Sequence, residues 1–298
     1  VADIRQGGVI AEAAAEAAAV FHFAAQVAVT TSLMAPRDDF SVNVEGTLLL
    51  LEALRRRANP APLCFASTNK VYGSLADIPL EASGQAYVPR DPELRAHGIP
   101  ETRGLDFHTP YGCSKGAADQ YVLDYARSFG VPTTVMRMSC IYGPRQLGTE
   151  DQGWVAHFLL RALRGQPITI FGDGRQVRDV LFVSDAVDAY LAAWRRMPAL
   201  RGRAYNLGGG PANAVSLLQL VAHAERLLGR RIETRFRPWR PGDQQYYVSD
   251  TRRIRRELGL AEPLGWRDGV ARLLRWLRED GLPAGKPAPA PRLAEAGP

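Results

Sequence analysis

The chain reads PYGCSKGAADQYVLDYARSFGVPTTVMRM from residue 110 to residue 138, and this stretch predicts a helix followed closely by a buried strand. The helix is expected from about Pro110 to Phe129, and the apolar run from Thr133 to Met138 has the length of a strand in a parallel sheet. Tyr111 and Lys115 are four residues apart, so they share one face of the helix near its beginning.

This tyrosine–lysine pair has a chemical interpretation and a purely structural one. An ammonium group beside a phenol favours the phenolate, so we expect the pKa of Tyr111 to fall from about 10 toward neutrality. Tyr111 would then be a general base for a sugar hydroxyl. Of the 37 lysines and arginines, only Lys70, Lys115 and Lys286 are lysines. Because arginine is always charged and forked, a lysine kept beside a tyrosine favours the chemical interpretation over a helix start with an exposed lysine.

Short apolar runs and helical segments alternate in the first half of the chain. Buried strands are expected over residues 20–25 and 63–67, and helices over residues 9–19 and 36–57. Residues 73–108 are rich in glycine, proline and acidic residues and are expected to form a long loop. The alternation predicts a parallel α/β sheet.

The regular alternation of short apolar strands and helices ends at about Tyr142, where a loop rich in glycine, glutamine and arginine follows. Further elements are expected as helices over residues 155–163, 185–195, 216–228, 251–258 and 266–278, and as strands over residues 168–171, 177–183 and 204–207. Residues 283–298 are rich in proline, alanine and glycine without periodicity, which predicts a disordered tail.

The composition disfavours several classes of protein. The chain has 298 residues, 46% hydrophobic and 23% charged, which is typical of globular proteins, and no apolar run is long enough to span a bilayer. Cys64, Cys113 and Cys140 are far apart and form no metal-spaced pair, which favours a reduced, cytoplasmic protein without a metal site. The formal charge of +6 has no basic stripe interleaved with aromatics, so nucleic acid is disfavoured and an anionic small substrate is favoured.

Polar residues follow the strand expected at 63–67. Ser67 and Thr68 stand at its carboxyl end, which is where ligands bind in an open α/β sheet. The Thr68 hydroxyl could hydrogen-bond both a substrate oxygen and the Tyr111 phenol, although Ser and Thr after a strand are also ordinary turn residues. Asn43, at the start of a helical segment, could order a loop or a water molecule near a cofactor, or be a helix cap.

Five motifs together resemble the extended short-chain dehydrogenases/reductases, the NAD-dependent nucleotide-sugar epimerases and dehydratases. The resemblance covers residue 1 to about residue 280. The motifs occur in the family's order, as HFAAQ at 22–26, NVEGT at 43–47, STNKVYG at 67–73, YGCSK at 111–115 and YGPR at 142–145. The resemblance implies a Rossmann-like, doubly wound parallel sheet with a smaller C-terminal α/β domain. Residues 1–140 and 176–209 would bind NAD, residues 141–175 and 210–281 the nucleotide sugar, and residues 282–298 would be a tail.

The resemblance also implies roles for single residues. Thr68, Tyr111 and Lys115 would be the catalytic triad, in which Tyr111 takes the hydroxyl proton while hydride leaves for NAD. Besides Tyr111 and Lys115, the cofactor would contact Asp3, Ile4, Ala24, Ala25, Gln26, Asn43, Ser67 and Met138. The substrate would contact Cys140, Arg145, Gln146, Gln176, Arg178 and Arg240, with Arg178 and Arg240 on the diphosphate. Homologues often dimerise through the helix that carries Tyr111, so a homodimer is expected.

Details of the motifs favour one activity within the family. The dehydratases carry Asp-Glu after the triad threonine, whereas this chain carries Asn69 and Lys70, so the acid needed for dehydration is missing. STNKVYG at 67–73 and YGPRQ at 142–146 most resemble the CDP-paratose 2-epimerases, which implies a CDP-linked sugar as substrate. A UDP-sugar 4-epimerase or UDP-glucuronate decarboxylase stays open, although Cys140 stands where many 4-epimerases carry asparagine. An inactive, cofactor-free homologue stays open as well.

One family motif does not occur in the sequence. The family begins with a strand and a Gly-x-x-Gly-x-x-Gly turn, where backbone amides at a helix N-terminus hold the cofactor's pyrophosphate. Gly7-Gly8 does not match this turn, and Asp3-Ile4 resembles the pair that follows the family's first β-α-β segment. The resemblance therefore implies that roughly 55–60 residues are missing ahead of Asp3. We expect a partial sequence of a real epimerase, inactive as it stands if the turn is indispensable.

Overall fold

The computed structural model describes residues 2–146 and 148–279. Its helices are α1 (Gly7–Glu16), α2 (Val29–Met34), α3 (Pro36–Phe40), α4 (Gly46–Arg55), α5 (Pro92–His97), α6 (Thr109–Ser128), α7 (Trp154–Leu163), α8 (Val183–Arg195), α9 (Met197–Leu200), α10 (Leu217–Leu228), α11 (Arg252–Leu258) and α12 (Trp266–Glu279). Its strands are β1 (Val20–His22), β2 (Leu63–Thr68), β3 (Leu80–Ser83), β4 (Ala86–Pro89), β5 (Thr133–Met138), β6 (Cys140–Tyr142), β7 (Ile168–Phe171), β8 (Val177–Phe182), β9 (Arg203–Leu207), β10 (Ala214–Ser216), β11 (Thr234–Arg237) and β12 (Tyr246–Tyr247).

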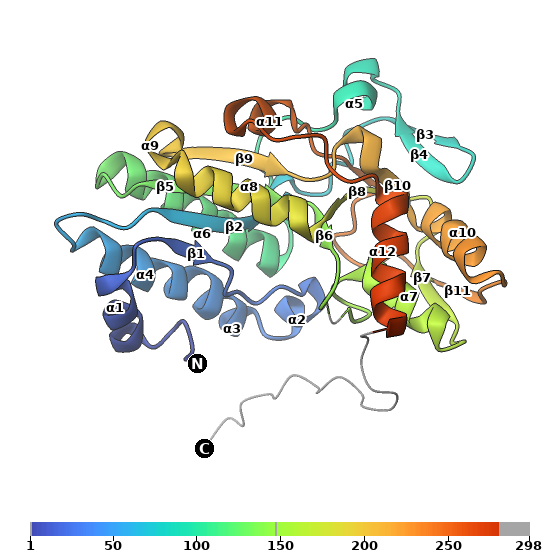
Figure 1. The fold of residues 1–298 in the computed structure, drawn as a ribbon, viewed down its shortest axis with the longest axis horizontal. Helices are drawn as coiled ribbons and strands as arrows, with labels where there is room; N and C mark the ends of the chain where they lie inside the picture. The colour runs from blue at the N-terminus through green and yellow to red at the C-terminus, as the bar shows by residue number, and fades with distance from the viewer. Residues whose placement is uncertain (1, 147, 280–298) are drawn as a thin grey trace.

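Four strands form the sheet on which the N-terminal half is built. They are arranged in the order β1-β2-β5-β9, and every neighbouring pair is parallel. Parallel neighbours need a crossover connection, and helices supply it between β1 and β2 and between β2 and β5 (Figure 1). The prediction of a parallel α/β sheet is therefore confirmed.

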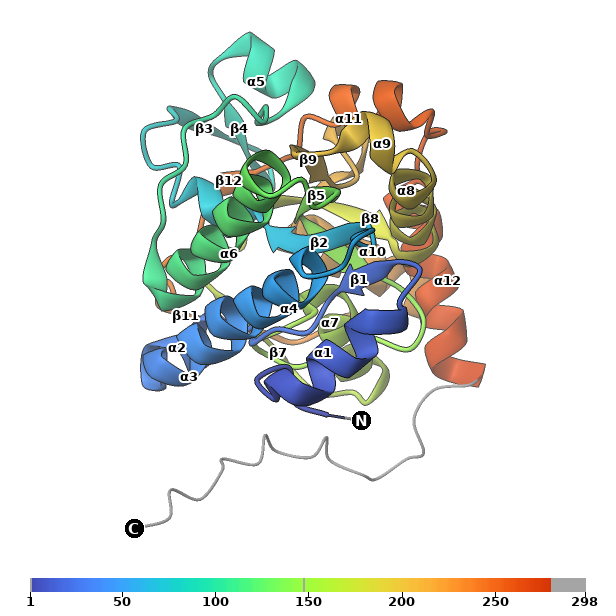
Figure 2. The ribbon, with the colours of Figure 1, turned by 90° about the vertical axis from the view of Figure 1, so that its left-hand side faces the viewer.

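Successive side chains of the central strands enter two different cores, because they point to opposite faces of the sheet. Leu63 and Phe65 of β2 are buried in a cluster with side chains of α1, α4 and α6. Cys64 and Ala66 belong to a cluster on the other face, with side chains of α8, α9 and α11. Figure 2 shows α4 and α6 on one side of the sheet and α8 on the other, which is the doubly wound arrangement.

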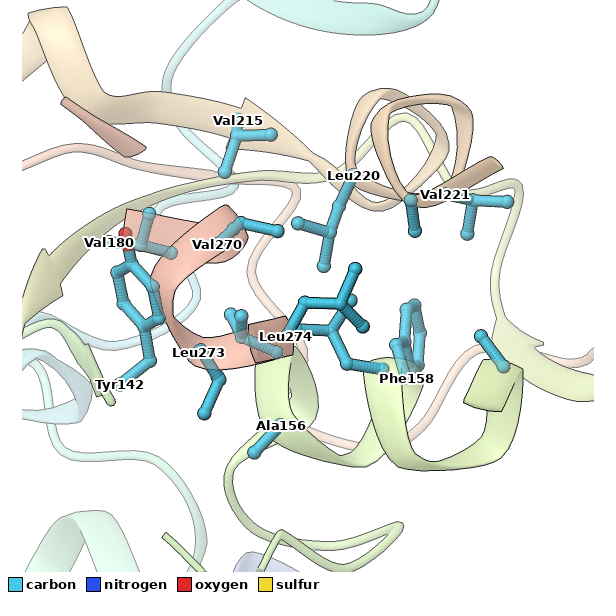
Figure 3. Close-up of a cluster of buried hydrophobic side chains, with 14 of the residues drawn as sticks. Tyr142, Ala156, Phe158, Val180, Val215, Leu220, Val221, Val270, Leu273 and Leu274 are labelled. Atoms are coloured by element: carbon cyan, nitrogen blue, oxygen red, sulfur yellow. The ribbon is translucent and has the colours of Figure 1, made fainter. Parts of the chain in front are cut away.

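The C-terminal half has its own strands and its own core. Strand β8 pairs with β10 antiparallel and with β6 and β12 parallel, while β7 pairs with β11. Helices α7, α10 and α12 enclose a buried apolar cluster beside these strands. Phe158, Leu220 and Leu274 meet there from three different helices (Figure 3). The C-terminal half supports one wall of the cavity described below, and the end of the N-terminal sheet supports the other.

The prediction of a long loop over residues 73–108 is wrong. The segment contains the antiparallel hairpin β3–β4 and helix α5. The Tyr87 hydroxyl donates to Asp173 Oδ2 at 2.7 Å, and Ser216 Oγ donates to the Gln85 carbonyl at 2.7 Å. These contacts join the hairpin to residues far away in the chain, so local composition did not indicate them.

Other departures from the predicted elements are smaller. The helix expected over residues 36–57 is divided into α3 and α4 by a π-helical turn at Ser41–Glu45. The strand expected over residues 20–25 ends at His22, and the sequence did not indicate α2, α9, β6, β10, β11 or β12. The predicted tail at 282–298 lies outside the described residues. Among the described helices, none is long and apolar enough to cross a membrane.

Candidate active site

A cavity of about 430 Å³ lies at the carboxyl edge of the N-terminal sheet. Thr68 ends β2, Met138 ends β5 and Ala25 follows β1, and all three line the cavity. The C-terminal half contributes the facing wall, which includes Cys140, Gln146, Trp154, Phe171, Gln176, Arg178 and Arg240. The cavity thus occupies the position at which open α/β sheets bind ligands.

Thr68, Tyr111 and Lys115 all line this cavity and are all buried. Tyr111 and Lys115 lie in the first two turns of α6, and the Tyr111 backbone N–H donates to Ser32 Oγ at 3.1 Å. The Lys115 ammonium lies over the Phe65 ring, with Nζ 4.2 Å from the ring centroid. No ion pair joins it to a carboxylate in the part of the chain that the structure describes. Its charge is therefore available to a ligand.

The structure contradicts the expected pKa of Tyr111. Burial raises the pKa of Tyr111 to about 12, and the nearby Asp39 carboxylate raises it while a hydrogen bond from Thr68 lowers it. Burial also lowers the pKa of Lys115 to about 7, because the interior disfavours the charged form. The sequence predicted the spacing of the two residues but not their burial, and burial is the largest cause of both pKa shifts.

Asn43 orders the loop after β1 and lies outside the lining of the cavity. Its Oδ1 accepts from the Gln26 backbone N–H at 2.9 Å, and its Nδ2 donates to the Gln26 carbonyl at 3.1 Å and to Ser114 Oγ at 3.0 Å. Of the alternatives for Asn43, this arrangement matches the ordering of a loop. Asp39, which the sequence analysis missed, joins the same network by accepting from Gln26 Nε2 at 2.7 Å. Burial raises the pKa of Asp39, and its spacing of four residues from Asn43 was the available signal.

The residues predicted to contact the cofactor separate into two groups. Ala25, Ser67, Met138, Tyr111 and Lys115 line the cavity, whereas the remaining residues of the prediction do not: Asp3, Ile4, Ala24, Gln26 and Asn43. Asp3 pairs with Arg5 at 2.6 Å near the surface, and Ile4 contacts Gly46 of α4. Gly7 begins α1 and packs against Leu49 of α4, so it faces away from the cavity.

Most residues predicted to contact the substrate lie on the facing wall. These are Cys140, Gln146, Gln176, Arg178 and Arg240, whereas Arg145 lies outside the lining. The Arg178 guanidinium donates to the carbonyls of Val177 at 2.8 Å and Gln244 at 2.7 Å. Arg240 forms an ion pair with Asp151 at 3.2 Å and lies 3.7 Å above the centroid of the Phe171 ring. Both guanidinium groups are thus held in place at the cavity wall.

Lys70 lines the cavity, although the sequence did not predict its position there. In the sequence, Lys70 was notable because it stands where the dehydratases of the family carry an acidic residue. In the structure, its side chain lines the cavity with that of Thr68. Its Nζ donates to the Gly242 carbonyl at 2.9 Å. Burial lowers the pKa of Lys70 to about 8, and the neighbouring Arg178 contributes to the shift. The scarcity of lysine in this arginine-rich chain was the available signal.

A doubly wound parallel sheet with a ligand cavity at its carboxyl edge defines the class of nucleotide-binding α/β enzymes. The sequence pattern of the NAD dependent epimerase/dehydratase family matches residues 1–208, and the chain belongs to this family. It is accordingly an enzyme of a family whose cofactor is NAD.

Three known proteins show the range of similarity. The CDP-paratose 2-epimerase of Salmonella typhi is 43% identical over 263 residues, which are 86% of this chain and 76% of the relative. The UDP-glucose 4-epimerase of Thermotoga maritima, solved with UDP-glucose, superposes with a TM-score of 0.79 at 27% identity, over 94% of this chain and 84% of that one. A dTDP-glucose 4,6-dehydratase of Streptomyces venezuelae, solved with NAD bound, gives 0.78 at 28% identity, over 94% and 79%.

Proposed function

We propose that this protein is an NAD-dependent epimerase of a nucleotide-linked sugar that acts as a CDP-paratose 2-epimerase does. The observation that carries the proposal is the meeting of Thr68, Tyr111 and Lys115 in one cavity at the edge of the sheet. The 43% identity to the Salmonella typhi enzyme supports carbon 2 of a CDP-linked sugar as the reacting centre. Asn69 and Lys70 offer no carboxylic acid for the expulsion of water, which disfavours a dehydratase.

The residues of the cavity fit NAD chemically. The Lys115 ammonium has hydrogen-bond donors for ribose hydroxyls, and Ala25, Ala66 and Met138 add small or apolar surface for a flat ring. We propose that these residues, with Ser67, hold the nicotinamide end of the cofactor. The predicted contacts of Asp3, Ile4, Ala24, Gln26 and Asn43 remain part of the proposal, with Asn43 acting through the loop that it orders.

The proposed reaction is an oxidation that is reversed on the other face of the sugar. Tyr111 takes the proton of the reacting hydroxyl and later returns it to the same oxygen. Thr68 hydrogen-bonds that oxygen, and Lys115 holds the cofactor's ribose beside Tyr111. NAD, when bound, accepts the hydride of the carbon and gives it back, so the substrate is inverted without net oxidation. The cavity must stay closed between the two halves of the reaction to retain the ketosugar.

We assign the facing wall to the substrate. Arg178 and Arg240 would bind the diphosphate by charge-assisted hydrogen bonds, and Cys140, Arg145, Gln146 and Gln176 would contact the rest of the nucleotide sugar. The proposed division remains an NAD-binding domain of residues 1–140 and 176–209 and a substrate domain of residues 141–175 and 210–281. Cys140, Gln176 and Arg178 belong to the first of these ranges, so both domains would contribute to the substrate wall.

We also propose a cytoplasmic homodimer. Its three cysteines are free, as expected in a reducing compartment. Helices α4 and α6 lie side by side on one outer face (Figure 2), and Phe129, which directly follows α6, is 48% exposed. This exposed apolar side chain supports dimerisation through this face. Sedimentation equilibrium tests the dimer, and Phe129→Glu should shift it toward monomer.

The function is tested by incubating the protein with NAD and CDP-paratose and following the anomeric proton by NMR. We expect the C2 epimer to accumulate to an equilibrium mixture, with no net formation of NADH. UDP-glucose in a parallel reaction tests the alternative 4-epimerase activity, which the fold shared with the Thermotoga maritima enzyme keeps open. Conversion of UDP-glucose without conversion of CDP-paratose would overturn the proposal.

A further inference from the structure

Lys70 forms hydrogen bonds with two separate parts of the cavity wall, at Thr68 and at Gly242. Its backbone N–H donates to Thr68 Oγ1 at 3.2 Å, which orients the hydroxyl at the proposed reacting centre. Its side chain extends across the cavity wall and donates from Nζ to the Gly242 carbonyl at 2.9 Å. Gly242 belongs to the loop 240–243, which also carries the proposed phosphate ligand Arg240. One residue therefore connects the reacting hydroxyls with the loop expected to hold the diphosphate.

The loop 240–243 is seated directly on the catalytic helix. A β-carbon built on Gly242 would lie 2.8 Å from Thr109 Cγ2, at the first residue of α6, and the backbone of Gly242 has φ +75°. A side chain at this position would be both strained and obstructed, which explains the glycine. The carbonyl that accepts from the Lys70 ammonium therefore belongs to a residue that packs against Thr109, two positions before Tyr111 in α6.

The charge of Lys70 is incompletely balanced by the protein. An ammonium has three donors, and the Gly242 carbonyl takes one of them. Within residues 2–146 and 148–279, no carboxylate forms an ion pair with Lys70, while Arg178 is close enough to lower its pKa and Asp243 close enough to raise it. With a pKa of about 8, Lys70 is mostly charged at neutral pH. A bound anion would complete its coordination.

We propose that the Lys70 ammonium binds the sugar-side phosphate of the substrate, and that it thereby selects carbon 2 for oxidation. This inference rests on the proposed function and deepens it. In a nucleotide sugar the diphosphate is attached to carbon 1, so carbon 2 is the ring carbon beside it and carbon 4 lies across the ring. Lys70 is two residues from Thr68 and is hydrogen-bonded to its hydroxyl through the backbone. A phosphate bound by the Lys70 ammonium would therefore bring carbon 2, rather than carbon 4, to the reacting hydroxyls.

The binding claim is tested by calorimetry with CDP and CMP, since CMP lacks the sugar-side phosphate. For the Lys70→Met variant we expect CDP affinity to fall about tenfold or more, because a charge-assisted hydrogen bond is lost. CMP affinity should change less than about twofold. The Lys70→Arg variant, which keeps the charge, should retain most of the preference for CDP. Arg231→Met removes a charge whose side chain is 93% exposed and should leave both affinities unchanged.

The pH dependence of the wild type supplies a measurement that does not depend on how Lys70→Met folds. The charged and titratable groups that act on Lys70 are Cys140 of β6, Arg178 of β8 and Asp243 of the loop. The wild type should lose preference for CDP over CMP as pH rises through about 8, whereas Lys70→Arg should keep it, because arginine does not deprotonate there.

The claim about carbon 2 is tested with CDP-paratose deuterated at carbon 2 or at carbon 4. In the wild type, deuterium should reach the bound cofactor from carbon 2, and Lys70→Met should reduce this transfer relative to transfer from carbon 4. If Lys70→Met keeps the CDP preference and the carbon-2 selectivity of an active wild type, the Lys70 proposal is wrong and the proposed function stands. If the wild type neither binds CDP nor converts CDP-paratose, the proposed function is wrong, and the Lys70 proposal, which depends on it, is wrong as well.

Discussion

Tyr111 is buried at the start of α6, and its pKa of about 12 keeps the phenol protonated in the ligand-free protein at neutral pH. A proton can leave it readily only when a further positive charge is close, and oxidised nicotinamide carries such a charge. The proposed base therefore depends on its bound ligand for activation.

Replacement of Tyr111 by phenylalanine tests its role as the proton acceptor. We expect Tyr111→Phe to lower kcat with CDP-paratose by about 10²- to 10⁴-fold, because the hydroxyl proton loses its acceptor. CDP affinity, measured by calorimetry, should stay unchanged. Tyr121→Phe is the matched control, since Tyr121 lies on the same helix and is 45% exposed. Equal turnover by the two variants would remove Tyr111 from the mechanism, and an absence of turnover in the wild type as well would favour the inactive, cofactor-free homologue.

Lys115 gives a stability prediction that depends on pH. Burial depresses its pKa from 10.5 to about 7, so the unfolded chain holds more protons than the folded one between these values. The charge therefore destabilises the fold most below pH 7, and the penalty fades as pH rises toward 10.5. We expect Lys115→Met to raise the free energy of unfolding by about 1–3 kcal/mol at pH 6.5, and by clearly less at pH 9.5. Urea denaturation at the two pH values measures this, and a gain that grows with pH would refute the assignment.

For single residues, the sequence motifs indicated which side chains belong to the site, but not how deeply those side chains are buried or what their pKa values are. The spacing of Tyr111 and Lys115 and the position of Thr68 after a strand were sufficient to predict one shared cavity. Desolvation and the path of a side chain depend on the whole fold, so neither the pKa of Tyr111 nor the position of Lys70 followed from the sequence. Asp39 shows the same limit, since its burial depends on packing between separate segments.

A buried ion pair connects helix α6, which carries the proposed base, to the central strand β5. Arg137 of β5 donates from Nε and Nη2 to the two carboxylate oxygens of Asp119 in α6, both at 3.0 Å, and Ser67 Oγ donates to the same carboxylate at 2.7 Å. The Asp119 side chain is 0% and that of Arg137 6% exposed. These bonds fix the register of α6 against the strand that carries Thr68.

Removal of one partner should be costly, because it leaves the other charge buried and unpaired. We expect Asp119→Asn to lower the free energy of unfolding by about 3 kcal/mol or more in urea denaturation. Glu81→Gln is the control, because the Arg95–Glu81 pair is about half exposed and should contribute about 0.5 kcal/mol or less. Similar losses in the two variants would contradict a structural role for the Asp119–Arg137 pair.

At the scale of elements, periodic segments were predictable and contact-dependent ones were not. Strands β2 and β5 and helix α6 carry strong local patterns, and their predicted bounds agree with the structure within a residue. The hairpin β3–β4 has little local signal because its position depends on Tyr87, Gln85 and their distant partners. The short strands β10 and β12 likewise exist only through pairing with β8.

At the scale of the whole molecule, the site depends on two packed halves. The N-terminal sheet contributes Thr68, Tyr111 and Lys115, and the C-terminal half contributes Arg178 and the loop 240–243 to the same cavity. The order of the motifs was sufficient to predict the family and the doubly wound sheet. It could not give the distance between the two walls, which is set by side-chain packing such as the cluster in Figure 3.

Transient oxidation at carbon 2 is tested by following the hydrogen on that carbon. CDP-paratose deuterated at carbon 2 is incubated with the protein and NAD in ordinary water, and the C2 epimer is analysed by NMR and mass spectrometry. Oxidation and return of the same hydride predict that the epimer keeps its deuterium. Loss of the label to water would show inversion by proton exchange, and failure to invert carbon 2 at all would contradict the assigned activity.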